Sequence, residues 1–275
     1  MAYECLIYQK LDGAVALITL NRPQRLNALS KQLLRELYRA LGDVEEDPEV
    51  RAVVITGAPR PDGRPCFCAG DDLKEIAAEP EPTREEAVEE AIQMLHDSGP
   101  EADVAPICRL LQTMSTPSIA AIDGVCTAGG IQLSLFCDFR VVSESAQVSD
   151  LEIKNLGSIG NGSAAVRLSR LVGAPWAKEM LFTGEPVDGH LAVQIGFANH
   201  VFPPGKLIEG ALTLARSIAR VRPQAVAITK AIINASLDME LTQALHFAYS
   251  ASLPLTGKEG AQAFAQKKSP PYGQP

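Results

Sequence analysis

The 275-residue sequence contains no run of about 20 apolar residues free of charge, so no segment is expected to span a membrane. Its longest basic run is Lys267-Lys268 and its net charge is −8. Proteins that bind nucleic acid through phosphates need a basic surface, so no nucleic-acid partner is expected. Residues Met1 to Cys5 include an acid where a secretory signal peptide has basic residues. These absences predict a cytoplasmic protein.

Patterns that bind metals or nucleotide cofactors are also missing. Of the 6 cysteines, Cys66 and Cys68 form one Cys-x-Cys pair with no second pair to complete a zinc site, and the 4 histidines are scattered. Residues Gly157 to Gly162 read G-x-x-G-x-G instead of the dinucleotide pattern G-x-G-x-x-G. A nucleophile elbow, a P-loop and an H-E-x-x-H helix are absent too. We therefore expect free thiols in a reducing compartment, no metal and no nucleotide cofactor.

Composition and periodicity indicate a globular mixed α/β chain. Hydrophobic residues make up 46% and charged residues 21%, as in ordinary globular proteins. Residues 4–20 predict a hairpin around Asp12-Gly13, and Ser30 is the expected N-cap of a helix. Apolar runs and helical spacing predict the other elements: strands at 51–56, 118–122, 139–142 and 198–202, and helices at 83–97, 104–115, 131–136, 163–171, 174–182, 188–195, 205–221, 223–236, 238–252 and 257–267. Strands and helices mix first, and helices dominate the end.

Two glycine-containing turns are candidates for binding an anion. Residues Cys68 to Leu73 form a turn before a predicted helix, and Gly124 to Gly130 form a turn between a predicted strand and a helix. Backbone N–H groups at helix N-termini can bind an anion or a developing oxyanion. Taken singly, each turn has another interpretation, in which its glycines only permit a tight turn.

A third candidate is the acidic pair in Asp150-Leu151-Glu152, which follows the predicted strand region and precedes the glycine-rich loop. A carboxylate partly buried beside apolar neighbours has a raised pKa and can carry a proton. The other interpretation is a structural acid that caps the loop. The residues alone leave these two interpretations open.

The order of short motifs along the chain resembles the crotonase superfamily, the enoyl-CoA hydratases and isomerases. The motifs run from residue 5 to residue 268, and each is weak alone while their order and spacing are specific. The resemblance implies an α/β fold, a spiral of ββα turns over residues 1–200, followed by a helical trimerisation region over 201–275. The motifs are Asn21-Arg22-Pro23, Leu26-Asn27-Ala28-Leu29, Ala69-Gly70-x-Asp72-Leu73, Pro117, Ala120-Ala121-Ile122-x-Gly124, Cys137-Asp138, Thr183-Gly184, Gly196-Phe197-Ala198-Asn199, Glu259-Gly260, Phe264 and Lys267.

The resemblance also implies a ligand and the groups that hold it. The substrate is an acyl-CoA thioester, with coenzyme A as part of the substrate and no separate cofactor. The backbone N–H groups of Asp71 and Gly129 polarise the thioester carbonyl, and the Asp71 side chain need not take part, because a backbone donor tolerates different side chains at that position. The protein is expected to form a homotrimer or a dimer of trimers. Coenzyme A is contacted near three residues of the same chain and by two residues of a neighbouring subunit: Leu26, Ala28 and Ala69, and Phe264 and Lys267 respectively.

One of the two catalytic acids of the hydratases is replaced in this chain. The resemblance places one acid three residues after Gly129, where the sequence has Gln132, and the other 20 positions further on, where it has Glu152. An amide hydrogen-bonds water or substrate but cannot exchange a proton. Glu152 as the single acid/base favours double-bond isomerisation of an enoyl-CoA, or a variant hydration or lyase reaction, with Gln132 orienting water or substrate.

Two alternatives to this enzyme remain open at the level of sequence. The loss of an acid at Gln132 is compatible with a CoA-binding scaffold that has lost hydratase activity. A hydrolase with Cys126 or Cys68 as nucleophile is disfavoured, because no histidine lies in a motif beside either thiol. The acidic segment 74–116 is longer than usual in the family, where it helps to wall the acyl pocket. We interpret its acids as a solvated face, and a role in selectivity stays open.

Overall fold

A computed structural model describes residues 3–78, 80, 83–86, 88–89, 104–160, 163–269 and 272. Its main feature is a six-stranded sheet with the strand order β1-β2-β3-β5-β7-β9. Strands β1 and β2 pair antiparallel, and the other neighbouring strands of this sheet pair in parallel. The strands are β1 (Leu6–Leu11), β2 (Val15–Leu20), β3 (Ala52–Gly57), β5 (Ser118–Ile122), β7 (Phe139–Ser143) and β9 (His200–Phe202).

A second, parallel sheet of three short strands has the order β4-β6-β8. Each of its strands follows one strand of the large sheet along the chain, and each is followed by a helix, which makes three ββα turns. Because the strands are parallel, the segments that follow them meet at one edge of the small sheet. The elements are β4 (Cys66–Cys68), β6 (Val125–Thr127) and β8 (Gln147–Ser149), followed by α2 (Leu73–Ala78), α5 (Gly129–Phe136) and the π-helix η2 (Glu152–Leu156) with α6 (Ser163–Val172).

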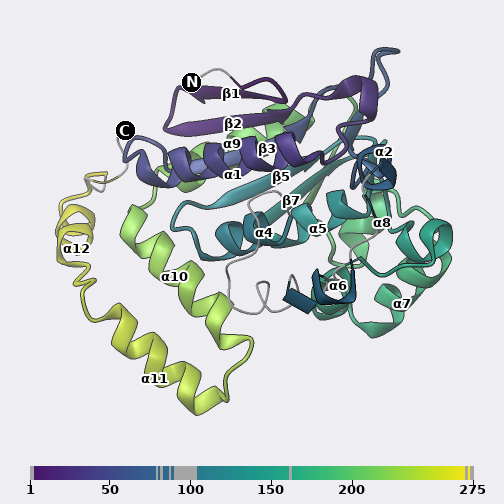
Figure 1. Ribbon diagram of the computed structural model, residues 1–275. Coiled ribbons are helices and arrows are strands. Elements are labelled where there is room, and N and C mark those ends of the chain that lie inside the picture. Colours follow the sequence, from purple (N-terminus) through teal and green to yellow (C-terminus); the bar gives the residue numbers. More distant parts are fainter. Residues whose placement is uncertain are drawn as a thin grey trace.

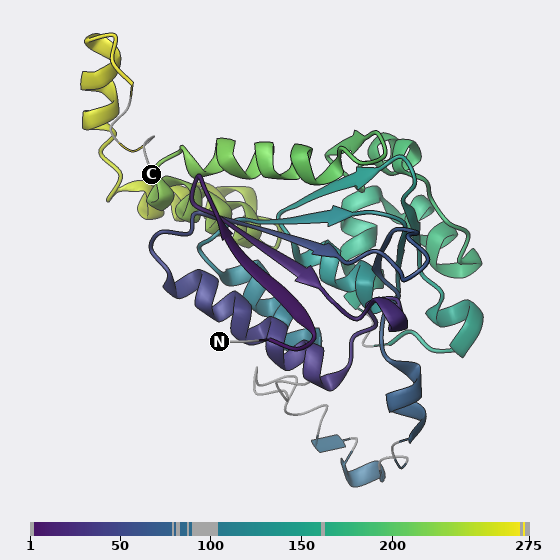
Figure 2. The same cartoon turned by 90° about the horizontal axis from the view of Figure 1, so that it is seen from above.

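Helices cover both faces of the large sheet (Figure 1). Helix α1 (Lys31–Glu46) and helix α4 (Val104–Thr113) lie on one face, and α9 (Leu207–Ala219) lies on the other, as the view from above also shows (Figure 2). The Ser30 side chain accepts the Leu33 N–H and caps α1, as the sequence predicts. The buried residues of α1 and α9 are apolar and follow helical spacing, so each helix fixes one hydrophobic layer on the sheet.

The C-terminal helices extend the chain away from the sheet. Helix α10 (Pro223–Ser236) runs past one end of the sheet. The remaining short helices belong to the body of the fold: η1 (Pro23–Arg25), α7 (Ala174–Thr183) and α8 (Gly189–Gln194). Helices α11 (Leu241–Ser252) and α12 (Lys258–Ala265) project beyond it (Figures 1 and 2). Helix α9 falls inside the expected helical region 201–275, yet it packs on the large sheet with Leu207, Ala211 and Ala215 buried.

The structure differs from the predicted elements in a few places. Strands β4, β6 and β8 were not predicted, because strands of three residues are too short to show alternation. Residues 152–156 form a π-helix where no helix was predicted. The predicted helix 83–97 falls largely outside the described residues. Within the described ranges, no helix is long and apolar enough to cross a bilayer, and no group of three His, Cys, Asp or Glu residues could hold a metal ion.

Candidate active site

The two predicted anion-binding turns lie directly against each other. Gly70, after β4, has a φ of 88°, and a Cβ built on it would lie 2.6 Å from the Ala128 Cβ and 3.1 Å from the Gly129 nitrogen. Only glycine allows both this left-handed backbone and such a close approach. The N–H groups of Asp71 and Gly129 therefore come from neighbouring turns, as the predicted oxyanion hole requires.

Helix α5 begins at the second of these turns. Its N-cap, Ala128, has φ 49° and ψ −122°, a combination that L residues rarely adopt. Backbone strain of this kind persists where the surrounding structure fixes it, often at functional sites. The first N–H groups of a helix have no acceptor within the helix, and the helix dipole places partial positive charge there. This end of α5 is therefore suited to stabilising negative charge.

The loop that follows β2 is held beside the same turns by backbone hydrogen bonds. The Ala69 N–H donates to the Leu26 carbonyl at 3.0 Å, and the Leu29 N–H donates to the Gly70 carbonyl at 2.8 Å. Leu26 adopts a left-handed φ of 53°. These bonds bring the predicted coenzyme A contacts Leu26, Ala28 and Ala69 next to the oxyanion turn.

Two polar side chains fix this loop from inside. The amide of Asn27, which is fully buried, donates to the carbonyls of Ala58 and Cys66 at 2.9 and 3.0 Å. Arg22 donates to a carboxylate oxygen of Asp72 at 2.7 Å and also to the Ala28 carbonyl. The ion pair holds the pKa of Asp72 below its usual range, because the guanidinium hydrogen-bonds and stabilises the charged carboxylate. The loop is thus preorganised.

Gln132 and Glu152 meet at the first turn of α5. The Gln132 amide nitrogen lies 3.4 Å from the Glu152 Oε1 and donates to it. Both side chains are almost fully buried, with 2% and 4% of their surface exposed. Glu152 is the first residue of η2, and its backbone N–H donates to the Asp150 Oδ1 at 2.9 Å. The structure therefore brings together the two side chains that the sequence proposes for catalysis.

The surroundings of Glu152 favour its neutral form. Burial, and then the negative charges of Asp150 and Asp71, raise the pKa of Glu152 from 4.5 to about 7. Burial also raises the pKa of Asp150. A carboxyl group that titrates near neutral pH can both accept and donate a proton, which suits a general acid/base. The site combines such a group with the N-terminal turn of α5 beside it.

A family model described as Enoyl-CoA hydratase/isomerase matches residues 10–275. The chain belongs to this family. It is 37% identical to the Bacillus subtilis protein YngF, whose name places it among the enoyl-CoA hydratases/isomerases, over 98% of each chain. It is 33% identical to the short-chain-enoyl-CoA hydratase of Clostridium acetobutylicum, over 86% of this chain and 84% of that one. A crystal structure of enoyl-CoA hydratase from Bacillus anthracis matches with TM-score 0.85 and 34% identity, over 98% and 99% of the two chains.

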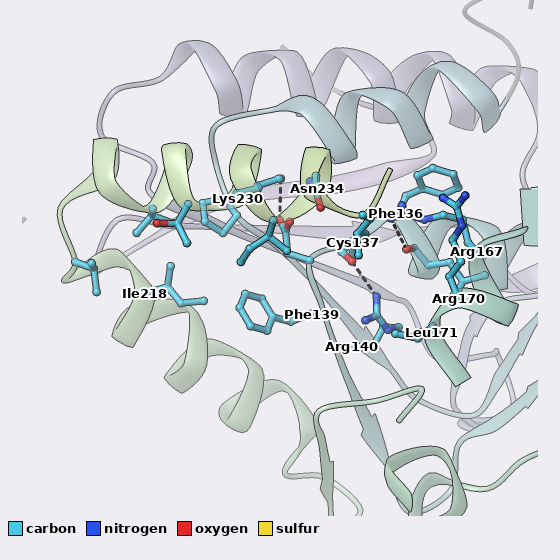
Figure 3. Close-up of a pocket in the computed structure, with 18 of the residues that line it drawn as sticks. Phe136, Cys137, Phe139, Arg140, Arg167, Arg170, Leu171, Ile218, Lys230 and Asn234 are labelled. Atoms are coloured by element: carbon cyan, nitrogen blue, oxygen red, sulfur yellow. Dashed lines mark hydrogen bonds and ion pairs between the residues drawn. The ribbon is translucent and has the colours of Figure 1, made fainter. Parts of the chain in front are cut away.

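The described part of this hydratase/isomerase-family chain also has a cavity of about 680 Å³, but it lies away from Glu152. The cavity borders the C-terminal end of α5, whereas the candidate site is at its N-terminal end. Figure 3 shows Phe139, Lys230 and Asn234 around it. The ammonium group of Lys230, which lines the cavity, is bonded within the chain. It donates to Asp138 and to the Leu111 carbonyl, both at 2.8 Å. We therefore do not assign the chemistry to this cavity.

The cysteine alternative finds no support in the structure. Cys68 and Cys126 are fully buried in the short sheet. Burial raises the pKa of both thiols above the ordinary value of 9.0. A nucleophilic cysteine needs a lowered pKa and access to substrate. These two residues therefore fill the core of the enoyl-CoA hydratase/isomerase fold.

The coenzyme A contacts predicted near the C-terminus are not brought to Glu152 within one chain. Phe264 lies on α12 and 86% of its surface is exposed, and Lys267 follows this helix. Helix α12 lies at the far end of the molecule from α2 and α5 (Figure 1). This placement matches the expectation that these two residues act on a neighbouring subunit, which stays a prediction.

Sequence reasoning did not single out two features of the site. The Asp71 side chain was set aside because its backbone N–H carried the proposed role, yet its charge acts on Glu152. Gly160 was treated as part of a glycine-rich loop, yet a Cβ on it would lie 2.7 and 2.8 Å from the two Glu152 carboxylate oxygens. Both depend on contacts between distant segments, and an acid in the motif Ala69-Gly70-Asp71-Asp72 was the available signal for the first.

Gly160 gives a direct test of the Glu152 geometry. We expect Gly160→Ala to displace the Glu152 carboxylate and lower its proton-transfer rate by about tenfold or more, because a misplaced catalytic group costs rate steeply. Gly157→Ala is the matched control, since Gly157 also has a left-handed φ, of 63°, but a Cβ there meets nothing within 4 Å. Exchange of substrate α-protons measures the rate, and equal rates in the two variants would contradict the prediction.

The raised pKa of Glu152 also predicts a pH-dependent stability. The folded protein binds the Glu152 proton more tightly than the unfolded chain, so its stabilisation is complete at low pH and is lost as pH rises through about 7. We expect Glu152→Gln to raise the unfolding temperature at about pH 8, where the wild-type carboxylate is charged and buried, and to change it much less at about pH 5. Thermal unfolding by circular dichroism measures both, and a pH-independent difference would contradict the account.

Proposed function

We propose that this protein binds an acyl-CoA thioester and stabilises its enolate, with Glu152 as the acid/base. The observation that carries the proposal is the buried Glu152 carboxyl, with its pKa near 7, beside the N-terminus of α5. Removing a proton α to a thioester places negative charge on the carbonyl oxygen. The N–H groups of Asp71 and Gly129 are the donors proposed to receive that charge. In other enzymes each such donor contributes about 3 kcal/mol to the transition state.

The Gln132 amide cannot carry a proton, so Glu152 is the only proton carrier in this scheme. A single acid/base favours double-bond isomerisation. In a double-bond isomerisation, the Glu152 carboxylate takes a proton from the α-carbon of a 3-enoyl-CoA, and the enolate forms. The same carboxyl returns the proton to the γ-carbon as the double bond moves. The Gln132 amide holds Glu152 through its hydrogen bond and orients water or substrate. A variant hydration or lyase reaction would use the same enolate.

The proposed ligand contacts follow from the loop after β2. Backbone hydrogen bonds hold Leu26 to Ala69 and Leu29 to Gly70, which supports the proposal that backbone groups near Leu26, Ala28 and Ala69 bind coenzyme A. The thioester itself accepts the electrons of the reaction, so the proposal includes no metal and no separate cofactor. Lys267 of a neighbouring subunit would supply a cation for a coenzyme A phosphate.

We further propose that the chain assembles as a homotrimer or a dimer of trimers. Neither α11 nor α12, which the structure describes in full, contains a buried residue. Apolar side chains on them are widely exposed, with 74% for Leu241, 70% for Tyr249 and 86% for Phe264. The cavity described above adds apolar surface on α10, the preceding helix, which lines it with Val226 and Ile233. Exposed apolar area of this kind supports an interface between copies of the chain, and sedimentation equilibrium measures the number of copies.

A panel of enoyl-, dienoyl- and aromatic acyl-CoAs tests the proposed reaction. Mass spectrometry reads addition of one water, and chromatography reads double-bond isomers at unchanged mass. The proposal predicts turnover of at least one thioester, lost in Glu152→Gln. A protein that binds acyl-CoA by calorimetry but neither converts it nor exchanges its α-protons would instead be the CoA-binding scaffold.

A further inference from the structure

We propose that Asp71 is a second catalytic carboxylate, the base that activates water for addition to an enoyl thioester. This inference rests on the proposed function, since it needs the thioester enolate and Glu152. It assigns a role to the side chain of a residue whose backbone N–H alone was expected to act. It also supplies the acid that is missing at Gln132.

The position of the Asp71 carboxylate is the first observation. A Cβ built on Gly129 would lie 3.2 Å from the Asp71 Oδ1, so this oxygen sits against the first residue of α5. Asp71 is partly exposed, so part of this residue meets solvent. Its backbone is fixed on both sides, by a β-bridge with Leu29 and by the ion pair between Asp72 and Arg22.

The second observation places the Glu152 side chain against the same turn of α5. Gln132 follows Gly129 by three residues in α5, and residues three apart share one face of a helix. Gln132 donates to Glu152, so Glu152 marks one end of this face and Asp71 marks the other. The negative charge of Asp71 acts on Glu152, which agrees with this proximity. Two carboxyl groups from different segments of the chain therefore flank the first turn of α5.

The proposed step balances as an addition of water. The water oxygen bonds to the β-carbon of the enoyl thioester while the Asp71 carboxylate takes a water proton. The π electrons of the Cα–Cβ bond move to the thioester, which becomes the enolate. Glu152, in its protonated form, then gives its proton to the α-carbon and the carbonyl is restored. Asp71 loses its proton to solvent and Glu152 regains one, so the net change is one added water.

This assignment agrees with the charges in the site. Asp71 is negative before the step and neutral after it, while the thioester oxygen becomes negative at the Gly129 N–H. One negative charge thus moves from the Asp71 carboxylate to the thioester oxygen. These two groups are never negative at the same time. Glu152, with its pKa near 7, is substantially protonated at neutral pH and suits the acid role.

Asp71→Asn tests the proposal, because the amide keeps the size of the side chain and one acceptor oxygen but cannot take a proton from water. A purely structural role would therefore largely survive this substitution. We expect hydration of an enoyl-CoA such as crotonyl-CoA to fall by about 10²-fold or more, and by a clearly larger factor than α-proton exchange into butyryl-CoA in D₂O, whose proton is carried by Glu152. Asp71→Glu should recover part of the hydration. The pH midpoint of exchange should fall in Asp71→Asn, since a like charge has been removed.

The outcomes separate this inference from the proposed function. If Asp71→Asn hydrates as fast as the wild type while Glu152→Gln loses exchange, the inference is wrong and the proposed function stands. The inference also fails if the wild type exchanges α-protons but hydrates none of the enoyl-CoAs, or if Asp71→Asn loses exchange and hydration alike. If neither Glu152→Gln nor Asp71→Asn changes any rate, both proposals fail.

Discussion

Glu152→Gln is expected to lower the rate of α-proton exchange by about 10² to 10⁴-fold, the range typical of a lost general acid/base. The substitution leaves the shape of the site unchanged, because the new amide oxygen can still accept the Gln132 N–H that now lies 3.4 Å from Glu152. Only the ability to carry a proton is removed. Substrate affinity should change little, so the loss should appear in kcat.

The matched control for this variant is Glu209→Gln on α9. Glu209 is exposed and pairs with Lys206 at 2.8 Å, away from the site, so the same chemical change there should leave the exchange rate unaltered. The exchange rate of the wild type should rise with pH through about 7, as Glu152 becomes the carboxylate that removes the α-proton. Glu152→Gln with wild-type exchange would show that another group is the base.

Gly70→Ala is expected to have the second largest effect, about 10²-fold in kcat. A Cβ at this position would lie 2.6 Å from the Ala128 Cβ and 3.1 Å from the Gly129 nitrogen, so the two turns must move apart. The proposed donors, the N–H groups of Asp71 and Gly129, would then no longer converge on one oxygen, and removing a single oxyanion donor costs about 10² to 10³-fold in other enzymes.

Gly63→Ala separates this effect from backbone strain. Gly63 has a φ of 80°, close to that of Gly70, but a Cβ there meets nothing within 4 Å. In both variants the left-handed backbone of an L residue should lower the free energy of unfolding by about 1 to 2 kcal/mol. In Gly70→Ala, overpacking lowers it further. The free energy of unfolding and the initial rates are measured for both variants. Equal kcat values in Gly70→Ala and Gly63→Ala would count against the oxyanion assignment.

Much of the fold could be predicted from the sequence because its elements carry strong local signals. The hairpin around Asp12-Gly13 and the helix capped by Ser30 were both confirmed. The short sheet was missed, since β4, β6 and β8 are three residues each and depend on pairing between distant segments. Glu152 was a candidate from the sequence, but no local pattern indicates its place at the start of a π-helix.

The candidate site divides in the same way. The glycine turns and the acidic pair at Asp150 and Glu152 were visible as local motifs, and the resemblance to crotonases ordered them. The structure adds how they meet: Gly70 against Gly129, Gln132 against Glu152. The approach of the Asp71 carboxylate to Gly129 follows from how β4 and β6 are paired, which the sequence does not specify.

The central claim is that the site holds the enolate of an acyl-CoA thioester while Glu152 carries the proton. Exchange of the α-protons of butyryl-CoA in D₂O, followed by mass spectrometry, tests it without assuming which reaction is completed. The account predicts deuterium incorporation by the wild-type protein at a rate that increases through about pH 7, and almost none in Glu152→Gln. Binding of butyryl-CoA with no incorporation at any pH would contradict it.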